Sequence, residues 1–157
     1  MKISEVISLK PISVSPNLTV GDTARVMERC GCAFLPVVSG GKVYGAITDR
    51  DLAIGATGHG LAPEVVRVSA IMSHPPICIS GESELEAAAK LMLEKNVRRL
   101  IVVDAGGQFL GVLSVIDLAG QLSDNDLSNT IHQFAMQNHP DPSHPQHNGP
   151  LPEIYIG

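Results

Sequence analysis

The chain is 157 residues long, which suits one ordinary domain or two small ones and is too short for a large enzyme with an attached regulator. Hydrophobic residues make up 44% of it and charged residues 17%, a composition that excludes an intrinsically disordered chain. The formal net charge of −5 and an aromatic content of three Phe and two Tyr argue against a basic or aromatic surface for nucleic acid.

The expected cellular setting follows from three features of the sequence. No apolar run approaches the roughly 18 residues of a membrane-spanning helix, and residues 1–5 do not resemble the start of a signal peptide. Three cysteines cannot all form pairs with one another, which favours a reducing compartment. We therefore expect a cytoplasmic protein that has no disulfide framework and does not contact a membrane.

The chain contains an internal repeat. Residues 3–39 align with residues 68–104 at an offset of 65, and residues 40–53 align with 106–119 at an offset of 66, which gives 16 identities in 51 aligned positions. The added residue falls in a Gly-rich turn between two apolar runs, where extra length is tolerated most easily. The chain is therefore a duplicated unit.

The first copy predicts a strand, an amphipathic helix, a hairpin and the start of a second helix. These elements cover residues 11–14, 20–27, 35–38 with 43–47, and a helix that begins near Asp49. The first helix should carry one buried face, formed by Val20, Thr23, Ala24 and Met27. Thr19 and Asp22 form a weak cap at its start.

The second copy predicts the same elements in the same order. They cover residues 76–79, 85–92, 100–103 with 109–113, and a helix that begins near Val115. The buried face of the first helix is formed by Leu85, Ala88, Ala89 and Met92. Ser83 and Glu86 have the spacing of a capping box. The order β-α-β-β-α in both copies predicts a mixed α/β (α+β) fold.

A third helix and a tail follow the second copy. The helix is expected to begin after Ser123 and to bury Leu127, Ile131, Phe134 and Ala135. The whole organisation has five parts: unit 1 (1–56), a linker (57–67), unit 2 (68–121), an accessory helix (122–138) and an extended tail rich in Pro and His (139–157).

Each hairpin ends in the pattern Gly-apolar-apolar-Thr/Ser-x-x-Asp. It occurs as Gly45-Ala46-Ile47-Thr48-Asp49-Arg50-Asp51 and as Gly111-Val112-Leu113-Ser114-Val115-Ile116-Asp117. This doubled pattern resembles the tandem CBS domain family, named after cystathionine beta-synthase. The resemblance implies two units packed about a pseudo-twofold axis as a regulatory module, with two clefts that often bind adenosine-containing ligands. It also implies that modules pair into homodimers.

The chemistry of the motif agrees with this implication. The Thr48 or Ser114 hydroxyl lies beside free N–H groups at the start of a helix, a setting that favours a phosphate or ribose oxygen. Asp51 or Asp117 follows three residues later on the same helix face and can accept both hydroxyl groups of a ribose. An ordinary helix cap without a ligand would give the same pattern, so this alternative stays open.

The resemblance also implies where the adenine and the phosphate would lie. The adenine would lie near Ile12, Ser13, Leu35 and Pro36 in the first copy, and near Ile77, Cys78, Leu100 and Ile101 in the second. A phosphate could meet Arg50 at the first site and Arg98 or Arg99 at the second. These arginines could instead be solvated, paired with surface carboxylates, or serve the ligand of the other copy.

Metal and catalytic sites are not expected. Cys30 and Cys32 lie at a helix end and are interpreted as small buried residues rather than zinc ligands. The histidines of the tail are separated by prolines, which rules out a helical pair of metal ligands. The motif hydroxyls have no histidine beside them, and the two motif aspartates are divided between two clefts. We therefore expect a protein that is not an enzyme.

The leading functional hypothesis is a regulatory module that senses AMP, ADP, ATP or an S-adenosylmethionine-like ligand. It would require no cofactor, and it would act through its dimer interface or on a protein partner in trans. The alternative is a ligand-free dimerisation and interaction scaffold that uses the repeats, the third helix and the tail. Nucleic-acid binding ranks last because of the net charge.

Overall fold

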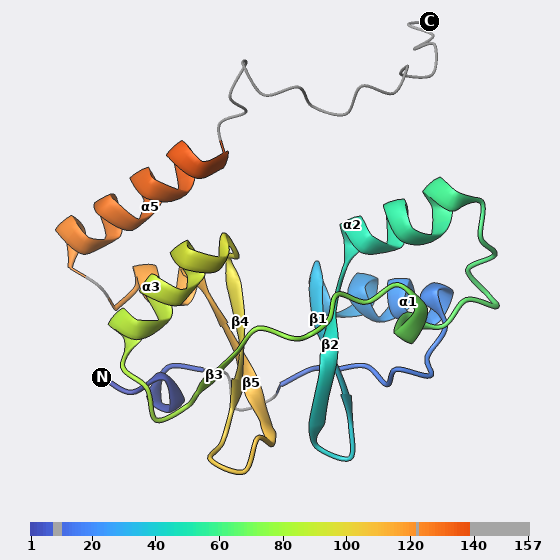
Figure 1. Ribbon diagram of the computed structural model, residues 1–157, viewed down its shortest axis with the longest axis horizontal. Coiled ribbons are helices and arrows are strands. Elements are labelled where there is room, and N and C mark those ends of the chain that lie inside the picture. The colour runs from blue at the N-terminus through green and yellow to red at the C-terminus, as the bar shows by residue number, and fades with distance from the viewer. Residues whose placement is uncertain (8–10, 122, 139–157) are drawn as a thin grey trace, which may run out of the picture.

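The two repeats form two units that lie side by side, with their sheets at the centre and helices at the outer sides (Figure 1). The computed structural model describes residues 1–7, 11–121 and 123–138, so the predicted tail lies outside the described residues. The mixed α/β class is confirmed. In the described part of the chain, no helix has both the length and the apolar character needed to cross a membrane.

The first unit is built on the antiparallel pair β1 and β2. Its elements are α1 (Val20–Cys30), β1 (Phe34–Ser39), β2 (Lys42–Thr48), α2 (Asp49–Asp51), a π-helical turn (Leu52–Ala56) and a 3-10 turn (Thr57–His59). The prediction of a strand over residues 11–14 is wrong, because this segment pairs only through one isolated parallel bridge between Val14 and Val37.

The second unit has a three-stranded sheet in the order β3-β4-β5. Its elements are β3 (Cys78–Ser80), α3 (Leu85–Lys95), β4 (Arg99–Val103), β5 (Phe109–Ser114) and α4 (Val115–Ala119). The Ile101 N–H donates to the Ile77 carbonyl over 3.1 Å, which continues the parallel pairing. Pro36 occupies the position equivalent to Ile101 in the first unit and has no N–H to donate, so the matching strand does not form there.

The two units exchange their leading segments. Ile3, in a 3-10 turn (Ile3–Glu5), is fully buried in the core of the second unit, and its N–H donates to the Ser83 carbonyl over 3.0 Å. Val68, its equivalent in the turn Val68–Ala70, is fully buried in the core of the first unit and donates to the Leu18 carbonyl over 2.9 Å. Each turn therefore packs onto the other repeat.

The first helices of the two units differ in what covers them. The predicted buried face of α3 is confirmed, whereas Ala24 on α1 is exposed although its equivalent Ala89 is 8% exposed. The difference has a simple cause: α5 (Asp124–Asn138) packs on α3 and buries Phe134 there. The expectation that Ile131 lies on the buried face of α5 is wrong, because Ile131 is 53% exposed and the neighbouring Thr130, at 8%, is buried in its place. The side chains of Leu127 and Ala135 lie outside the described part.

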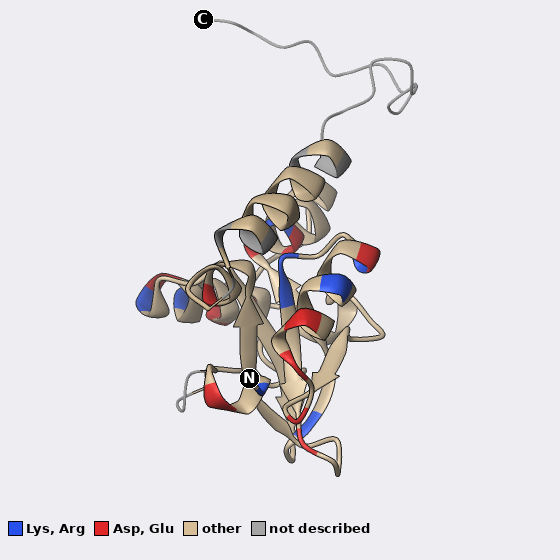
Figure 2. Cartoon of the chain, turned by 90° about the vertical axis from the view of Figure 1, so that its left-hand side faces the viewer, with Lys and Arg blue, Asp and Glu red and all other residues tan. Residues whose placement is uncertain are grey.

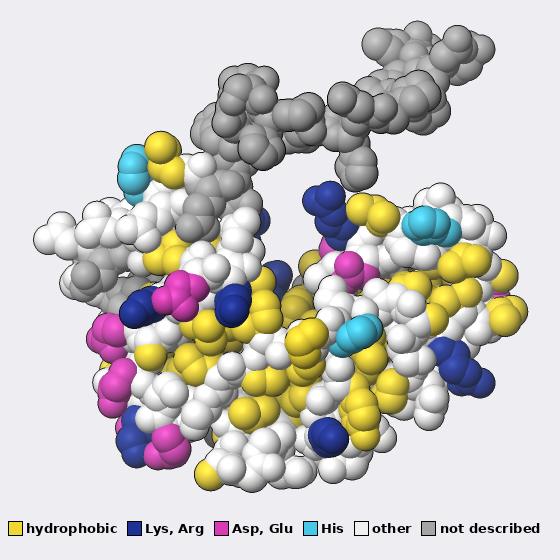
Figure 3. Space-filling model, viewed as in Figure 1, with side chains coloured by type: hydrophobic (Ala, Val, Ile, Leu, Met, Phe, Trp, Pro, Cys, Tyr) yellow, Lys and Arg dark blue, Asp and Glu magenta, His cyan; other side chains and the backbone are white. Residues whose placement is uncertain are grey.

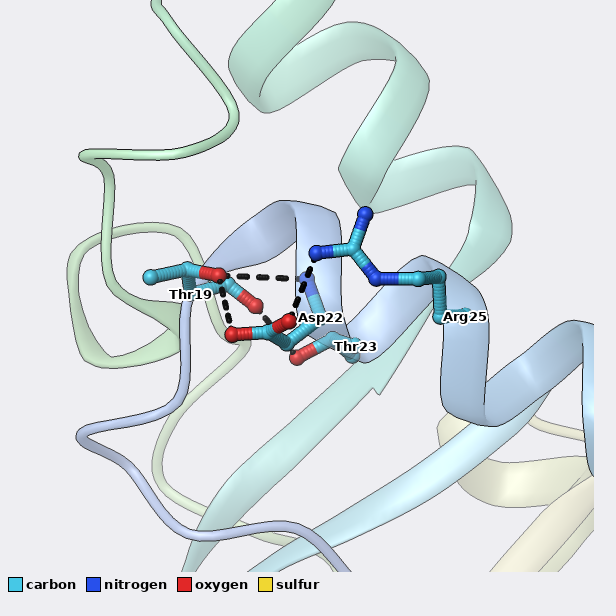
Figure 4. A network of polar contacts seen from close by, with 4 residues as sticks. All are labelled: Thr19, Asp22, Thr23 and Arg25. Atoms are coloured by element: carbon cyan, nitrogen blue, oxygen red, sulfur yellow. Dashed lines mark hydrogen bonds and ion pairs between the residues drawn. The ribbon is translucent and has the colours of Figure 1, made fainter.

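The cap of α1 is a four-residue network (Figure 4). The Asp22 N–H donates to Thr19 Oγ1 over 3.1 Å, and that hydroxyl donates to Asp22 Oδ2 over 2.9 Å. The Thr23 hydroxyl donates to the Thr19 carbonyl, and Arg25 pairs with Asp22 Oδ1 over 2.7 Å. The predicted cap at Ser83 is wrong, since α3 begins one residue later, with Glu84 at the N-cap and no side-chain cap bond.

Candidate ligand-binding clefts

Each repeat closes a capping box at the start of its second helix. The Thr48 N–H donates to Asp51 Oδ2 over 2.9 Å, and the Asp51 N–H donates to Thr48 Oγ1 over 3.1 Å. In the second unit the Ser114 N–H donates to Asp117 Oδ2 over 2.7 Å, and the Asp117 N–H donates to Ser114 Oγ over 3.2 Å. The boxes use Oδ2 of each aspartate, and Oδ1 has no hydrogen-bond partner among the described residues.

The same backbone contact anchors each box to the hairpin of its unit. The Asp49 N–H donates to the Ala33 carbonyl over 3.2 Å, and the Val115 N–H donates to the Arg98 carbonyl over 3.0 Å. The residue that leads into the first hairpin strand therefore fixes where the helix starts. This contact holds Arg98 and Arg99 close to the Ser114 motif.

A cavity of about 490 Å³, which we call the first cleft, opens between the two units beside the Thr48 motif. Figure 3 shows this face of the molecule hollowed at the junction of the units. Seven of the predicted site residues line it: Thr48, Arg50 and Asp51 from the first unit, and Ile77, Arg98, Arg99 and Ile101 from the second. The carboxylate and hydroxyl of one repeat therefore share a cavity with the arginines and isoleucines of the other.

The remaining predicted residues of the first copy lie outside the lining of this cleft. Leu35 and Pro36 are buried in β1, with Leu35 only 1% exposed in the core. Ile12 is 45% exposed, and Ser13 is exposed as well. The apolar lining of the cleft comes from both units instead, with Ala33, Phe34 and Ala46 from the first and Ile77 and Ile101 from the second.

A second cavity, of about 450 Å³, lies against the Ser114 motif, and we call it the second cleft. It is lined by Arg98, Arg99, Ser114, Val115, Ile116, Ile131 and Phe134. Asp117, Cys78 and Leu100 are not in this lining, and Leu100 is fully buried in the core. Sequence reasoning did not place Ile131 and Phe134 at a site, because their spacing on α5 indicates only a helix face that packs.

The arginines that line the clefts form no ion pair with another described residue. Within the described residues, the ion pairs are those of Met1 with Glu84, Lys2 with Glu82, Arg25 with Asp22, and Lys90 with Glu94. Arg50, Arg98 and Arg99 take part in none of them. Elsewhere on the surface the charges alternate, as Figure 2 shows for the side of the second unit. In the first cleft these arginines share the lining with the carboxylates of Asp49 and Asp51, whereas Arg98 and Arg99 are the charged residues that line the second cleft.

The three cysteines differ in their exposure, since Cys30 is exposed and Cys32 and Cys78 are partly buried. Cys30 is exposed at the end of α1, so the interpretation of it as a buried residue is wrong. Burial raises the pKa of the Cys78 thiol and, with Cys30 nearby, that of the Cys32 thiol. Over the described part of the chain, no three His, Cys, Asp or Glu side chains gather as metal ligands would.

Comparison with known sequences defines the class of protein. The sequence model of the CBS domain matches residues 3–55 and again 68–124. The chain therefore belongs to the CBS domain family and carries two copies of the domain.

Two curated relatives show the range of proteins that share this region. The CBS domain-containing protein YhcV of Bacillus subtilis is 30% identical over 87% of this chain and 96% of its own length. Inosine-5'-monophosphate dehydrogenase of Methanocaldococcus jannaschii is 32% identical over 74% of this chain but only 23% of its own length. The similarity to that enzyme is therefore confined to part of it.

Solved structures share the fold. A putative signal-transduction protein with CBS domains from Burkholderia ambifaria aligns with a TM-score of 0.68 at 25% identity, over 78% of this chain and 98% of its own. CBSX2, solved in complex with AMP, aligns with a TM-score of 0.66 at 25% identity, over 76% of this chain and 93% of its own. The CBS domain pair of MJ0100, solved with 5-methylthioadenosine and S-adenosyl-L-methionine, aligns with a TM-score of 0.68 over 76% of this chain and 94% of its own. At 22% identity this similarity shows the fold alone.

Proposed function

We propose that the protein is a regulatory module that binds an adenine nucleotide in the first cleft. The observation that carries the proposal is the composition of that cleft, where a motif carboxylate, three arginines and an apolar wall share about 490 Å³. A volume of this size is typical of small-molecule sites. The AMP complex of CBSX2 supports the same class of ligand.

Each part of a nucleotide has a counterpart in the cleft. The purine would pack against Ile77 and Ile101, and the ribose hydroxyls would donate to the free Oδ1 of Asp51. The phosphate would be bound by Arg50 and the Arg98–Arg99 pair through charge-assisted hydrogen bonds. Three guanidinium groups against the two carboxylates of Asp49 and Asp51 leave the lining with a net positive charge, which favours an anion over the positively charged sulfonium of S-adenosylmethionine, so we rank AMP, ADP and ATP above it.

Isothermal titration calorimetry against AMP, ADP, ATP and S-adenosylmethionine tests the proposal. Asp51→Asn keeps an oxygen for the Thr48 N–H but removes the carboxylate, and we expect it to weaken nucleotide binding about tenfold or more. Asp117→Asn is the matched control, because it makes the same change in the capping box of the second unit, outside the lining of the first cleft. No heat of binding at millimolar nucleotide, or an unchanged affinity in Asp51→Asn, would contradict the proposal.

We infer that the output is a change in the arrangement of the two units, passed on through a homodimer or to a protein partner in trans. A ligand can shift such an equilibrium only by its preference for one state, which is typically about 1–3 kcal/mol. The role would be non-catalytic and cytoplasmic, as the sequence suggests. Light scattering with and without saturating AMP measures whether occupancy changes the oligomeric state.

A ligand-free scaffold is the second candidate, and one observation favours it. Both capping boxes are complete without a ligand, so the motifs already have a structural role. In that case the chain would self-associate or bind its partner equally well with and without nucleotide. A stable dimer that binds none of the four ligands in the calorimeter would support the scaffold.

A further inference from the structure

The two clefts share their positive charge. Arg98 and Arg99 line both the first cleft and the second cleft. The equivalent positions in the first unit hold Ala33 and Phe34, so the chain has one such pair for two sites. The repeat has duplicated the motif but not the cations that flank it.

The first cleft has charged groups that it does not share. Asp49, Arg50 and Asp51 line it together with the arginine pair. Arg50 is exposed and, in the described part, has no ion-pair partner, so its guanidinium is available to a bound anion. A ligand in the first cleft can therefore draw on three cations.

The second cleft depends wholly on the shared pair. Among the described residues that line it, Arg98 and Arg99 carry all the charge, and the others are Ser114 and four apolar side chains. Ile116 stands where Arg50 stands in the first unit and is 76% exposed. If both arginines bind an anion in the first cleft, no charged side chain in the lining of the second cleft is left to bind a second anion.

We propose that the two clefts are coupled negatively through Arg98 and Arg99, so that an anionic nucleotide in the first cleft excludes a second one from the second cleft. The coupling has two physical sources. The guanidinium groups cannot give full hydrogen bonding to two phosphates at once, and the two phosphates repel each other across the pair. This inference rests on the proposed function, because it assumes that the first cleft takes a nucleotide.

Substitution at position 116 tests the coupling by adding the missing cation. In the wild-type chain, calorimetry with AMP should give one site per chain, followed by a second site that is at least tenfold weaker or not measurable. Ile116→Arg supplies the second cleft with its own guanidinium, at an exposed position where a long side chain fits. We expect the second AMP to bind within about threefold of the first in this variant.

Ile54→Arg is the matched control. Ile54 is also an exposed isoleucine, 52% accessible, and it lines neither cleft, so this variant adds the same charge without supplying a cleft. In Ile54→Arg, as in the wild type, the second AMP should bind at least tenfold more weakly than the first or not measurably. Circular dichroism confirms that each variant is folded before titration.

The outcomes separate the coupling from the proposed function. Two equal and independent AMP sites in the wild type, or a folded Ile116→Arg chain with no gain at the second site, would overturn the coupling and leave the proposed function standing. A gain of equal size in Ile54→Arg would overturn it as well, since net charge alone would then explain the effect. Absence of AMP binding in every variant would overturn the proposed function and the coupling together.

Discussion

The Arg99 guanidinium lies over the ring of Phe34, with its central carbon 5.8 Å from the ring centroid. These two residues occupy equivalent positions in the two repeats, each at the start of its hairpin strand. The contact therefore joins the units close to their pseudo-twofold axis. Both residues also line the first cleft, so the contact places a cation at the junction that a ligand would occupy.

A double-mutant cycle on this pair should show a measurable coupling. Phe34→Leu keeps apolar bulk but removes the aromatic face, and Arg99→Gln removes the charge. At a partly exposed site, a cation–π contact contributes about 0.5–1 kcal/mol, and we expect a coupling of that size in the free energy of unfolding measured with urea. Effects of the two single substitutions that simply add, within about 0.3 kcal/mol, would show that the contact is energetically silent.

The caps of the two leading helices should respond differently to loss of a hydroxyl. Thr19→Ala removes the group that accepts the Asp22 N–H, and N-cap losses of this kind cost about 1 kcal/mol. Ser83→Ala is the matched control, because no side-chain bond caps α3. Urea unfolding should show a loss of stability for the first variant and a change within about 0.5 kcal/mol for the second. Equal losses would contradict the assignment of the caps.

Much of the fold can be predicted from the sequence because the repeat supplies each pattern twice. The helix spacing, the hairpins and the two capping boxes at Thr48 and Ser114 depend on contacts between residues that are close in the sequence. The predictions that fail concern burial that depends on tertiary packing. Ala24 and Ala89 are identical in the alignment, yet only Ala89 is covered, because α5 packs on α3 and no described segment covers α1 in the same way.

The composition of the first cleft is the part of the site that sequence reasoning could not supply. The motif Thr48-x-x-Asp51 marks one side of the cleft, but the other side comes from Ile77 and Ile101, some 30 to 50 positions later. Which repeat faces which motif is decided by how the units dock. The sequence therefore left open whether the arginines of one copy serve the ligand of the other, and in the structure Arg98, Arg99, Ile77 and Ile101 line the cleft beside Thr48.

The Asp22 carboxylate should titrate below its ordinary range. Hydrogen bonds from Arg25 and Thr19 lower the pKa of Asp22 from its ordinary value of 3.8. Because the pKa is lower in the folded state, the interaction stabilises the chain above the unfolded-state value and is lost as the pH falls through the folded-state value. Carboxyl NMR should show the Asp22 pKa rising in Arg25→Gln. Because the Arg25–Asp22 pair is exposed, high salt should also raise the pKa of Asp22. An Asp22 pKa that responds neither to the substitution nor to salt would contradict the role of Arg25.

Gly45 has no room for a side chain, because Met72 and Ser73 of the second unit lie directly against it. A Cβ at this position would lie 2.6 Å from the Ser73 carbonyl oxygen and 2.9 Å from Met72 Sδ. The neighbouring Ala46 exchanges two hydrogen bonds with Ser73, of 3.0 and 2.8 Å, and this bridge leads into the prolines that line the first cleft. Gly45→Ala must therefore push Met72 and Ser73 away from β2.

We expect Gly45→Ala to cost about 1–3 kcal/mol of unfolding free energy, as overpacking of a close contact does, and to weaken AMP binding as well. Gly58→Ala is the control, since a Cβ there would meet only the Ala53 carbonyl oxygen at an ordinary 3.5 Å. That substitution should change neither quantity appreciably. If Gly45→Ala lowered stability but left AMP affinity intact, the bridge between Ala46 and Ser73 would hold the fold without shaping the cleft.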